Sequence, residues 1–251
     1  MADFTALFAT LDPKIAEQVD YLIRHIPFAL WESIYTTVLS TALAYVIGLP
    51  LGVLLVTGEE GGVRPLPPLA MRILNVAVNL LRSVPFLILM VLVIPLSRLI
   101  LGTSVGTAAT IVPLVVAAFP FVARLVEGSL REMDKGVVEA AQSMGCSPVQ
   151  IITKVLLPEC RPSLLNGFTT AFITILGYGA MAGAIGGGGL GMLALNYGFQ
   201  RSHTLAMWVA VIVLVILVQV FQSVGTHFAL RSDKRVNRVE KSRKNRGTKQ
   251  A

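Results

Sequence analysis

The residues whose types and spacing could support chemistry lie between Arg124 and Arg161, the only long charged stretch between residues 99 and 200. Its basic and acidic residues balance, and uncharged runs long enough to cross a bilayer lie on both sides. The pattern inside it reads Glu139-Ala140-Ala141, then Gly145, and then Val155, Leu157 and Pro158. Two adjacent alanines let the groove of another protein approach the backbone closely, and Glu139 can pair with a basic partner. These residue types would suit a protein-docking loop at a membrane surface, although on their own they also fit an ordinary cytoplasmic helical hairpin.

The first half of this loop carries the signals of a short capped helix. Asp134 can cap a helix over residues 137–144, because its side chain accepts hydrogen bonds from free backbone N–H groups. Gly145 then supplies the left-handed residue that ends such a helix. We therefore predict a helix followed by a tight glycine turn.

The second half begins with a capping box. Ser147 is followed by Pro148, which suits the first position of a helix, and by Gln150 three residues after the cap. An apolar stripe follows, formed by Ile151, Ile152, Val155 and Leu156. Pro158 limits the length of this second helix. The predicted fold of the loop is helix, turn and helix, which by itself also fits an ordinary cytoplasmic helical hairpin.

Composition places the loop in a membrane protein. Charged residues make up 14% of the chain, against about 25% in soluble domains. Hydrophobic residues reach 54%, and the mean hydropathy is +0.72. The expected fold class is an all-α polytopic membrane protein, which excludes a soluble enzyme.

The uncharged runs predict about five transmembrane helices, since each needs about 20 apolar residues. We place the spans at residues 33–58, 82–97, 99–123, 164–185 and 204–230. The glycine run from Gly186 to Gly191 predicts a bend followed by a short outer helix. The membrane domain thus covers residues 33–230 and contains the 124–161 loop. Residues 1–32 form a separate segment, acidic on balance and without the features of a signal peptide, in which an amphipathic helix is expected to lie at the membrane interface.

The net charge of +7 comes entirely from residues 231–251, which hold nine Lys or Arg residues and two acidic ones. Beside a membrane span, such a tail is expected to be a cytoplasmic anchor near anionic membrane lipid. Nucleic-acid binding is the less favoured alternative. With the tail inside and five spans, the inner side carries seventeen basic residues and the outer side four. The N-terminus is therefore predicted to be extracytoplasmic.

Several other motifs do not indicate chemistry. The Gly186-x-Gly188-x-x-Gly191 pattern resembles a dinucleotide-binding fingerprint, but no strand precedes it. The chain has no P-loop motif, so ATP hydrolysis is expected in a separate chain. Cys146 and Cys160 fall in the loop assigned to the cytoplasm, where a disulfide is not expected. No cluster suggests a metal or another cofactor. None of the five predicted spans contains Asp or Glu, which argues against an ion-coupled secondary carrier.

The 124–161 loop resembles the EAA loop of ABC importer permeases, in which E-A-A, a glycine and I-x-L-P recur at this spacing. Only the isoleucine position departs, to Val155. Further segments, RSVPFLILMVLVIPLSR, FPFVARLVEGSL and GYGAMAGAIGGGGLG among them, resemble the permeases of the methionine-import ABC transporters. The resemblance covers most of residues 33–230.

This resemblance implies the fold and partners of a small type I permease with five spans. It implies a homodimer in a bacterial inner membrane, two cytoplasmic ATPase subunits, and an extracytoplasmic substrate-binding protein, either periplasmic or a lipoprotein. The chain itself would not be an enzyme but would form the translocation pathway for methionine. Coupling to the ATPase would pass through residues 139–158, with Glu139, Ala140, Ala141, Gly145, Val155, Leu157 and Pro158 as the contact and shaping residues. Alternatives are a permease for another small amino acid or organic anion, or, in a different class, a secondary carrier or channel.

The fourth span is the candidate for a gate, because it follows directly from the loop. Its segment from Gly177 to Gly183 consists mostly of small residues around two large ones, Tyr178 and Met181. Residues three apart lie on one face of a helix, so the two side chains could fill a space between two copies of this span. The alternative is that both face lipid or pack within one subunit.

Overall fold

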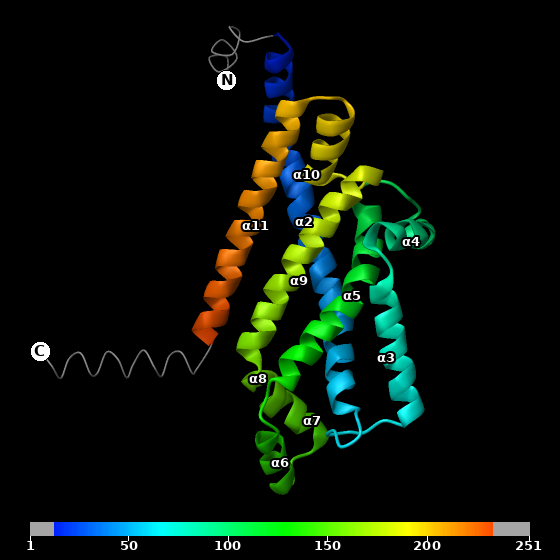
Figure 1. The fold of residues 1–251 in the computed structure, drawn as a ribbon, viewed down its shortest axis with the longest axis vertical. Coiled ribbons are helices and arrows are strands. Elements are labelled where there is room, and N and C mark those ends of the chain that lie inside the picture. The colour runs from blue at the N-terminus through cyan, green and yellow to red at the C-terminus, as the bar shows by residue number, and fades with distance from the viewer. Residues whose placement is uncertain (1–12, 233–251) are drawn as a thin grey trace, which may run out of the picture. The chain divides into compact units, whose positions relative to one another are not determined.

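The computed structural model describes residues 13–232, and every regular element in that range is a helix. In chain order the elements are α2 (Pro13–Thr57), α3 (Pro68–Ser83), α4 (Phe86–Leu101), α5 (Thr107–Arg131), α6 (Lys135–Ser143), α7 (Pro148–Gln150), the π-helix η1 (Ile151–Leu156), α8 (Leu157–Glu159), α9 (Arg161–Ala182), the 3₁₀-helix η2 (Gly183–Ile185), α10 (Gly189–Met192), the π-helix η3 (Leu193–Gln200) and α11 (Thr204–Ser232) (Figure 1). This confirms the predicted all-α fold class.

Four helices are long and apolar enough to cross a membrane: α2, α5, α9 together with η2, and α11. A fifth span is formed if α3 and α4 count as one, and these two helices meet at a bend of 107°. The predicted number of about five spans therefore agrees with the structure.

The position of the second span was predicted wrongly. We expected it over residues 82–97, but the helix is interrupted at Pro85, between the end of α3 and the start of α4. A proline lacks the N–H that a helix needs and disfavours a helical conformation in the residue before it. The preceding helix α3 is amphipathic, with polar residues along one side, so no long uncharged run marks it in the sequence. The third span also begins later than expected, at Thr107, after a loop that contains Gly102 and Gly106 in the left-handed conformation.

Helix α2 joins two segments that the sequence pattern had separated. It runs from Pro13 through the predicted boundary at residue 33 to Thr57. A helix of 45 residues is about 67 Å long at 1.5 Å per residue, more than twice the hydrocarbon thickness of a bilayer.

The expectation that no span contains Asp or Glu is also wrong. Glu32 lies within the candidate span of α2, and Glu127 lies within α5.

Contacts divide the chain into two compact units. The first unit holds residues 13–44, 82–119 and 172–219 of the described chain. Its core forms where the first half of α2 packs on η3 and the start of α11, through Leu22, Leu193, Ala194, Tyr197, Ala206 and Ala210. Tyr21 and Tyr197 stack across this contact with their rings 3.6 Å apart. The core ties the N-terminal part of α2 to the short outer helix.

The second unit holds residues 45–81, 120–171 and 220–232 of the described chain. Leu55 of α2, Met71 of α3 and Ala123 of α5 form a buried cluster in it, flanked by Leu51 and Leu74. Gly52 permits the close approach of α2 to α5, because a Cβ at this position would lie 2.5 Å from the carbonyl oxygen of Ala123. This packing brings α2, α3 and the end of α5 together at the start of the charged loop.

Candidate functional site

The first arm of the charged loop folds as its caps predict. Asp134 accepts a hydrogen bond from the backbone N–H of Gly136 at 2.9 Å and caps α6. Gly145 ends the turn with a φ of +76°, and the N–H of Cys146 donates to the Ala141 carbonyl at 3.2 Å. No atom lies within 4 Å of a Cβ built on Gly145. Glycine is therefore required there by its backbone conformation and not by lack of space.

The second arm begins with the predicted capping box. The Ser147 hydroxyl accepts from the N–H of Gln150 at 3.4 Å, and the Gln150 side-chain oxygen accepts from the N–H of Ser147 at 2.9 Å. Beyond it, α7, η1 and α8 form one continuous helical run that ends at Cys160, two residues after Pro158. The π-helical middle was not predicted. Pro158 has no backbone N–H to donate to a carbonyl one turn earlier. The hydrogen bonds before it are therefore the longer-range i to i+5 bonds of a π-helix.

The residues singled out from the sequence divide between the surface and the interior. Glu139, Ala140, Gly145 and Pro158 are exposed, whereas Val155 and Leu157 are half-buried. Ala141 is buried against the rest of its unit. Of the predicted apolar stripe, Ile151 and Leu156 are buried. The two arms are in contact through α6 and η1, and Ala140 remains exposed.

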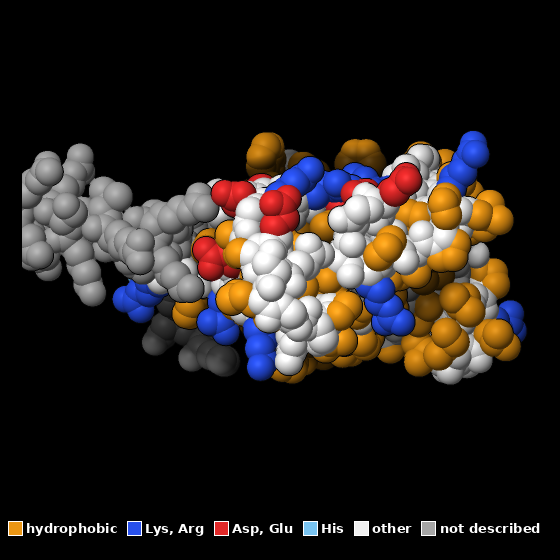
Figure 2. All heavy atoms as spheres, turned by 90° about the horizontal axis from the view of Figure 1, so that it is seen from below, with side chains coloured by type: hydrophobic (Ala, Val, Ile, Leu, Met, Phe, Trp, Pro, Cys, Tyr) orange, Lys and Arg blue, Asp and Glu red, His pale blue; other side chains and the backbone are white. Residues whose placement is uncertain are grey.

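An exposed apolar surface on this hairpin was not predicted from the sequence. We call it the hairpin patch: Val137, Ala140, Met144 and Val149. Met144 is 76% exposed and Val149 63%. The first three are spaced three and four residues apart, so they share one side of α6 and its C-terminal turn. Figure 2 shows hydrophobic side chains among acidic and basic ones on the face seen from below. Exposed apolar side chains grouped and rimmed by polar ones mark a protein-binding surface.

A charge network lies at the base of the hairpin, where α5 ends. We call it the basal network. Glu127 is 7% exposed and lies between two arginines, accepting from Arg124 at 2.6 Å and from Arg131 at 2.9 Å. Arg131 also pairs with Glu59 in the loop after α2. The i, i+3 and i+4 spacing of Arg124, Glu127 and Arg131 is the sequence signal that could have revealed the pairs within α5.

The basal network also reaches α3. Arg124 donates to the side-chain oxygens of Asn75, at 2.9 Å, and Asn79, at 2.8 Å. A buried charge is tolerated only when it is paired and hydrogen-bonded. The network therefore fixes α3, the end of α5 and the loop after α2 in one arrangement.

The glycine-rich turn after α9 forms the bend and short outer helix that were predicted. Gly186, Gly188 and Gly189 all have positive φ. The Glu32 carboxylate of α2 accepts from the N–H of Gly189 at 2.8 Å, and the Ser33 hydroxyl accepts from that of Leu190 at 2.9 Å. Glu32 thus caps the outer helix from a distant part of the chain. This role was not predicted, because Glu32 had been assigned to the N-terminal segment.

The two candidate gate residues lie differently in the first unit. Tyr178 stacks on Phe86 of α4, with ring centroids 4.3 Å apart and the planes within 6°. Met181 is 48% exposed. Nothing lies within 4 Å of a Cβ built on Gly177 or Gly179. Met181 is therefore partly open to its surroundings, while Tyr178 has an aromatic partner within the chain.

The described residues do not offer the groups of a metal site. No three His, Cys, Asp or Glu side chains between residues 13 and 232 are placed to hold a metal ion. Cys146 and Cys160 are both free thiols. The hairpin patch offers a surface that can bind a protein. The acidic and basic side chains of the basal network hold α3 and α5 together.

A family comparison decides which proteins this arrangement belongs to. Residues 48–237 match the family described as binding-protein-dependent transport system inner membrane component. The chain belongs to this family. It is thus a permease subunit, a non-catalytic multi-pass component of an inner membrane.

Individual relatives agree with this assignment. The probable D-methionine transport system permease protein MetI of Vibrio cholerae is 50% identical over 228 residues, which cover 91% of this chain and 99% of that protein. The corresponding protein of Pasteurella multocida is 46% identical over 81% of this chain and 94% of its own length. A solved chain of the MetNI methionine ABC transporter, in an inward-facing conformation, matches with a TM-score of 0.80 and 41% identity over 85% of this chain and 98% of that chain. This permease therefore has the type I fold of that transporter's membrane subunit.

The basal network leads to a prediction about stability. Replacing Glu127 with alanine leaves the largely buried Arg124 without its carboxylate partner, and we expect a loss of about 3–5 kcal/mol in the free energy of unfolding. Glu59→Ala removes a carboxylate from the same Arg131, but at an exposed position, and should cost about 1 kcal/mol or less. Thermal unfolding of both purified variants measures the difference. Equal losses would show that the network does not hold this unit together.

Proposed function

We propose that this chain is the transmembrane permease of an ATP-driven methionine importer. The hairpin patch carries the proposal, because an exposed apolar surface on a capped, rigid hairpin needs a protein partner. The names of the relatives support methionine as the solute, and the relatives from Vibrio cholerae and Pasteurella multocida are 50% and 46% identical to this chain. A permease for another small amino acid or organic anion is the alternative, since the hairpin sequence does not specify the solute.

The proposed assembly has two copies of this chain, two ATP-binding subunits and an extracytoplasmic substrate-binding protein. The similarity to a chain of the MetNI methionine ABC transporter supports the pairing with an ATPase. The hairpin patch, with Glu139 at its edge, would enter a groove of each ATPase subunit. Gly145, Val155, Leu157 and Pro158 would shape the hairpin rather than form the main contact, because Val155 and Leu157 are half-buried.

Coupling follows from the chain beyond the hairpin. Helix α9 starts at Arg161, directly after the second arm, and continues without a break to Ala182. A displacement of the hairpin by the ATPase would therefore act on the first turn of this helix, and a rigid helix carries such a displacement along its length. Met181, near the far end of α9, would then move relative to its copy in the partner subunit. We propose Met181 as the gate residue, with Tyr178 positioned by Phe86 beside it.

We propose three functional regions and one orientation. Residues 1–32 would be extracytoplasmic or interfacial, residues 33–230 the membrane domain, and residues 231–251 the cytoplasmic tail. Ser232 lines one cavity with Ser129 and Glu159, which supports placing the tail and the hairpin loop on the same side of the membrane. Cysteines introduced at Ser143 and Lys249 should both resist impermeant thiol reagents in intact cells, and one at Thr10 should react. Labelling of Ser143 from outside would reverse the orientation.

Transport by reconstituted protein tests the function. Proteoliposomes that contain this permease, its ATPase and its binding protein should accumulate methionine only with ATP. Gly145→Val forces a β-branched residue to positive φ at a cost of about 1–3 kcal/mol, so we expect lost uptake and weaker ATPase co-purification. Gly128→Val is the matched control, because Gly128 is also exposed and has open space but lies within α5 without positive φ.

The identity of the solute and the coupling role of the hairpin are tested by different results. ATP-dependent uptake of another amino acid, with methionine neither transported nor competing, would reject methionine as the solute. Normal uptake in Gly145→Val would reject the role of the hairpin. Unequal effects of Gly145→Val and Gly128→Val, with both proteins correctly inserted, are the result we expect.

The gate proposal leads to a separate prediction. A flexible methionine can fill an irregular gap between two helices, and its removal should leave a wider path. Met181→Ala is therefore expected to give ATP-independent methionine flux in proteoliposomes. Met192→Ala, which shortens a similarly exposed methionine (43% against 48%) on α10, should not. Flux at the wild-type level in Met181→Ala would place the gate elsewhere.

A further inference from the structure

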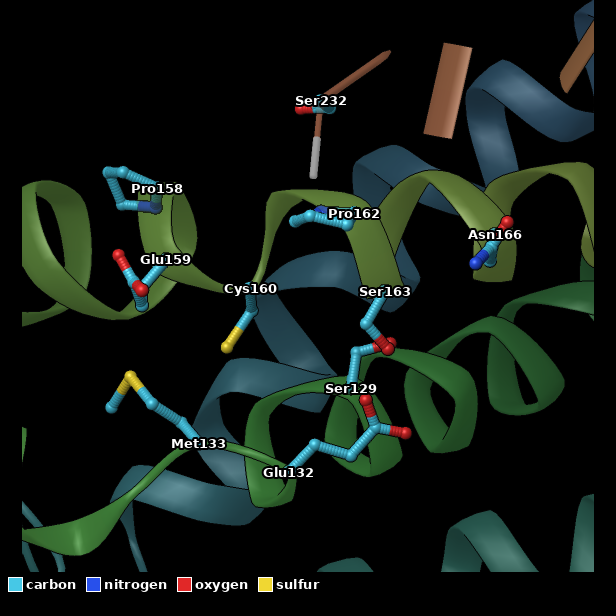
Figure 3. Close-up of a pocket in the computed structure, with 10 residues that line it drawn as sticks. All are labelled: Ser129, Glu132, Met133, Pro158, Glu159, Cys160, Pro162, Ser163, Asn166 and Ser232. Carbon is cyan, nitrogen blue, oxygen red and sulfur yellow. The ribbon is translucent and has the colours of Figure 1, made fainter. Parts of the chain in front are cut away.

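A small polar cavity lies beside the glycine-rich turn that follows α9, inside the first unit. Its wall is mostly polar, and four of its lining residues carry hydroxyl groups: Ser33, Thr36 and Thr37 of α2 and Thr110 of α5. Its volume is about 10 Å³, whereas the cavity beside the hairpin in Figure 3 measures about 440 Å³. One water molecule needs about 10–15 Å³ of such space. The small cavity therefore has room for one water and for no larger ligand.

The three threonine hydroxyls already donate their protons to backbone carbonyls. Thr36 and Thr37 donate to carbonyls one turn earlier in α2, at 2.7 and 2.6 Å. Thr110 donates to the carbonyl of Gly106 at 2.9 Å. A hydroxyl has one proton and two lone pairs, so these oxygens can take part in a further hydrogen bond only as acceptors. A ligand that binds between them must be a donor.

The Ser33 hydroxyl has the opposite requirement. Its oxygen accepts from the backbone N–H of Leu190 at 2.9 Å, and its own proton remains to be donated. A ligand that accepts this proton and also donates to two threonine oxygens needs one lone pair and two protons, which a water molecule has. A metal cation has no lone pair to offer and would leave the Ser33 proton without an acceptor.

Burial makes these requirements costly to leave unmet. Thr37 is 1% exposed and Thr110 is 5% exposed, and buried polar groups in proteins are satisfied by other protein groups or by ordered water. The glycines of the turn leave room at the hydroxyls. A Cβ built on Gly187 would lie 2.9 Å from the hydroxyl oxygen of Thr110, and one built on Gly189 would lie 2.6 Å from that of Ser33. A side chain at either position would therefore crowd the site.

We propose that one water molecule is bound in this cavity, where it accepts a hydrogen bond from Ser33 and donates to the oxygens of Thr37 and Thr110. Three hydrogen bonds are the usual number for a buried water. The water joins α2 to α5. Both helices also bond to the turn, because Ser33 accepts from Leu190 and Thr110 donates to the carbonyl of Gly187 at 3.4 Å. The water thus fixes the orientation of the Ser33 hydroxyl and holds the turn against two spans.

A structure of the assembled transporter, at a resolution that shows ordered water, tests the site directly. In the wild type we expect one peak within about 2.5–3.0 Å of the hydroxyl oxygens of Ser33, Thr37 and Thr110. Thr37→Val replaces that hydroxyl with a methyl group of similar shape, so the peak should be lost. Thr41→Val is the matched control, because Thr41 lies on the same helix and is also 1% exposed but does not line this cavity. Its peak should remain.

Hydrogen–deuterium exchange of the Leu190 amide tests the same water in solution. Without the water, Ser33 is no longer held as an acceptor, and losing part of one hydrogen bond should speed exchange about threefold to tenfold in Thr37→Val. Thr110→Val removes the other acceptor from a different helix and should have the same effect. Thr37→Ser keeps the oxygen, so it should exchange at the wild-type rate, as should Thr41→Val.

Three results would overturn the proposal. One is a wild-type structure that shows other buried waters but no peak in this cavity. A second is an anomalous scattering peak in the cavity after sodium is replaced by thallous ions, which would assign the site to a monovalent cation. The third is Leu190 exchange that is equally fast in Thr37→Val and Thr41→Val, which would show that no ligand in this cavity orients Ser33.

Discussion

The burial of Glu127 between two arginines is the interaction on which the second unit depends. Its side chain is 9% exposed and that of Arg124 is 18% exposed, so neither charge is solvated by bulk water. Each is stable there because the other is present and because the side-chain oxygens of Asn75 and Asn79 accept hydrogen bonds from Arg124. This requirement ties α3 to α5. The hairpin begins four residues beyond α5, on a base that cannot shift without breaking these contacts.

The hairpin is rigid for local reasons that add to this base. Each arm has its own cap, and Gly145 reverses the chain between them. Buried Ala141, Ile151 and Leu156 hold the two arms to the unit. The apolar side chains that remain outside can therefore present a fixed surface to a partner, which lowers the entropic cost of association. Helix α9 begins directly after the hairpin, so a partner bound at the hairpin would, on our proposal, act on the first turn of a membrane helix.

The features predicted correctly from the sequence are those decided within a few residues. The caps at Asp134 and Ser147 and the turn at Gly145 depend only on neighbouring backbone groups, and all three are present. Long apolar helices were found for a similar reason, because hydropathy is a property of one segment. The region around Pro85 shows the limit of prediction from hydropathy. The polar residues of α3 lower its hydropathy, so the helix was not recognised, although the side chains of Asn75 and Asn79 in it accept hydrogen bonds from Arg124 of α5.

Contacts between distant residues could not be predicted in this way. Glu32 binds the N–H of Gly189, 157 residues away, and no local pattern connects the two. The helical spacing of Tyr178 and Met181 placed them on one face, but stacking on Phe86 of another helix gives Tyr178 a partner inside the chain. The exposure of Met144 likewise depends on how the two arms of the hairpin pack, which no local sequence pattern specifies. Each of these depends on which helices meet, and a single sequence without its fold does not show that.

The central claim is that the hairpin patch is the surface that binds the ATPase. A photoreactive benzoylphenylalanine placed at Met144 in cells that make the whole transporter tests it most directly, because that side chain is 76% exposed. The same group at Leu99, which is 82% exposed on α4, serves as the control. The account predicts that light joins position 144, and not position 99, to the ATP-binding subunit. A cross-link to that subunit from position 99, or none from position 144 in an assembled and active transporter, would contradict it.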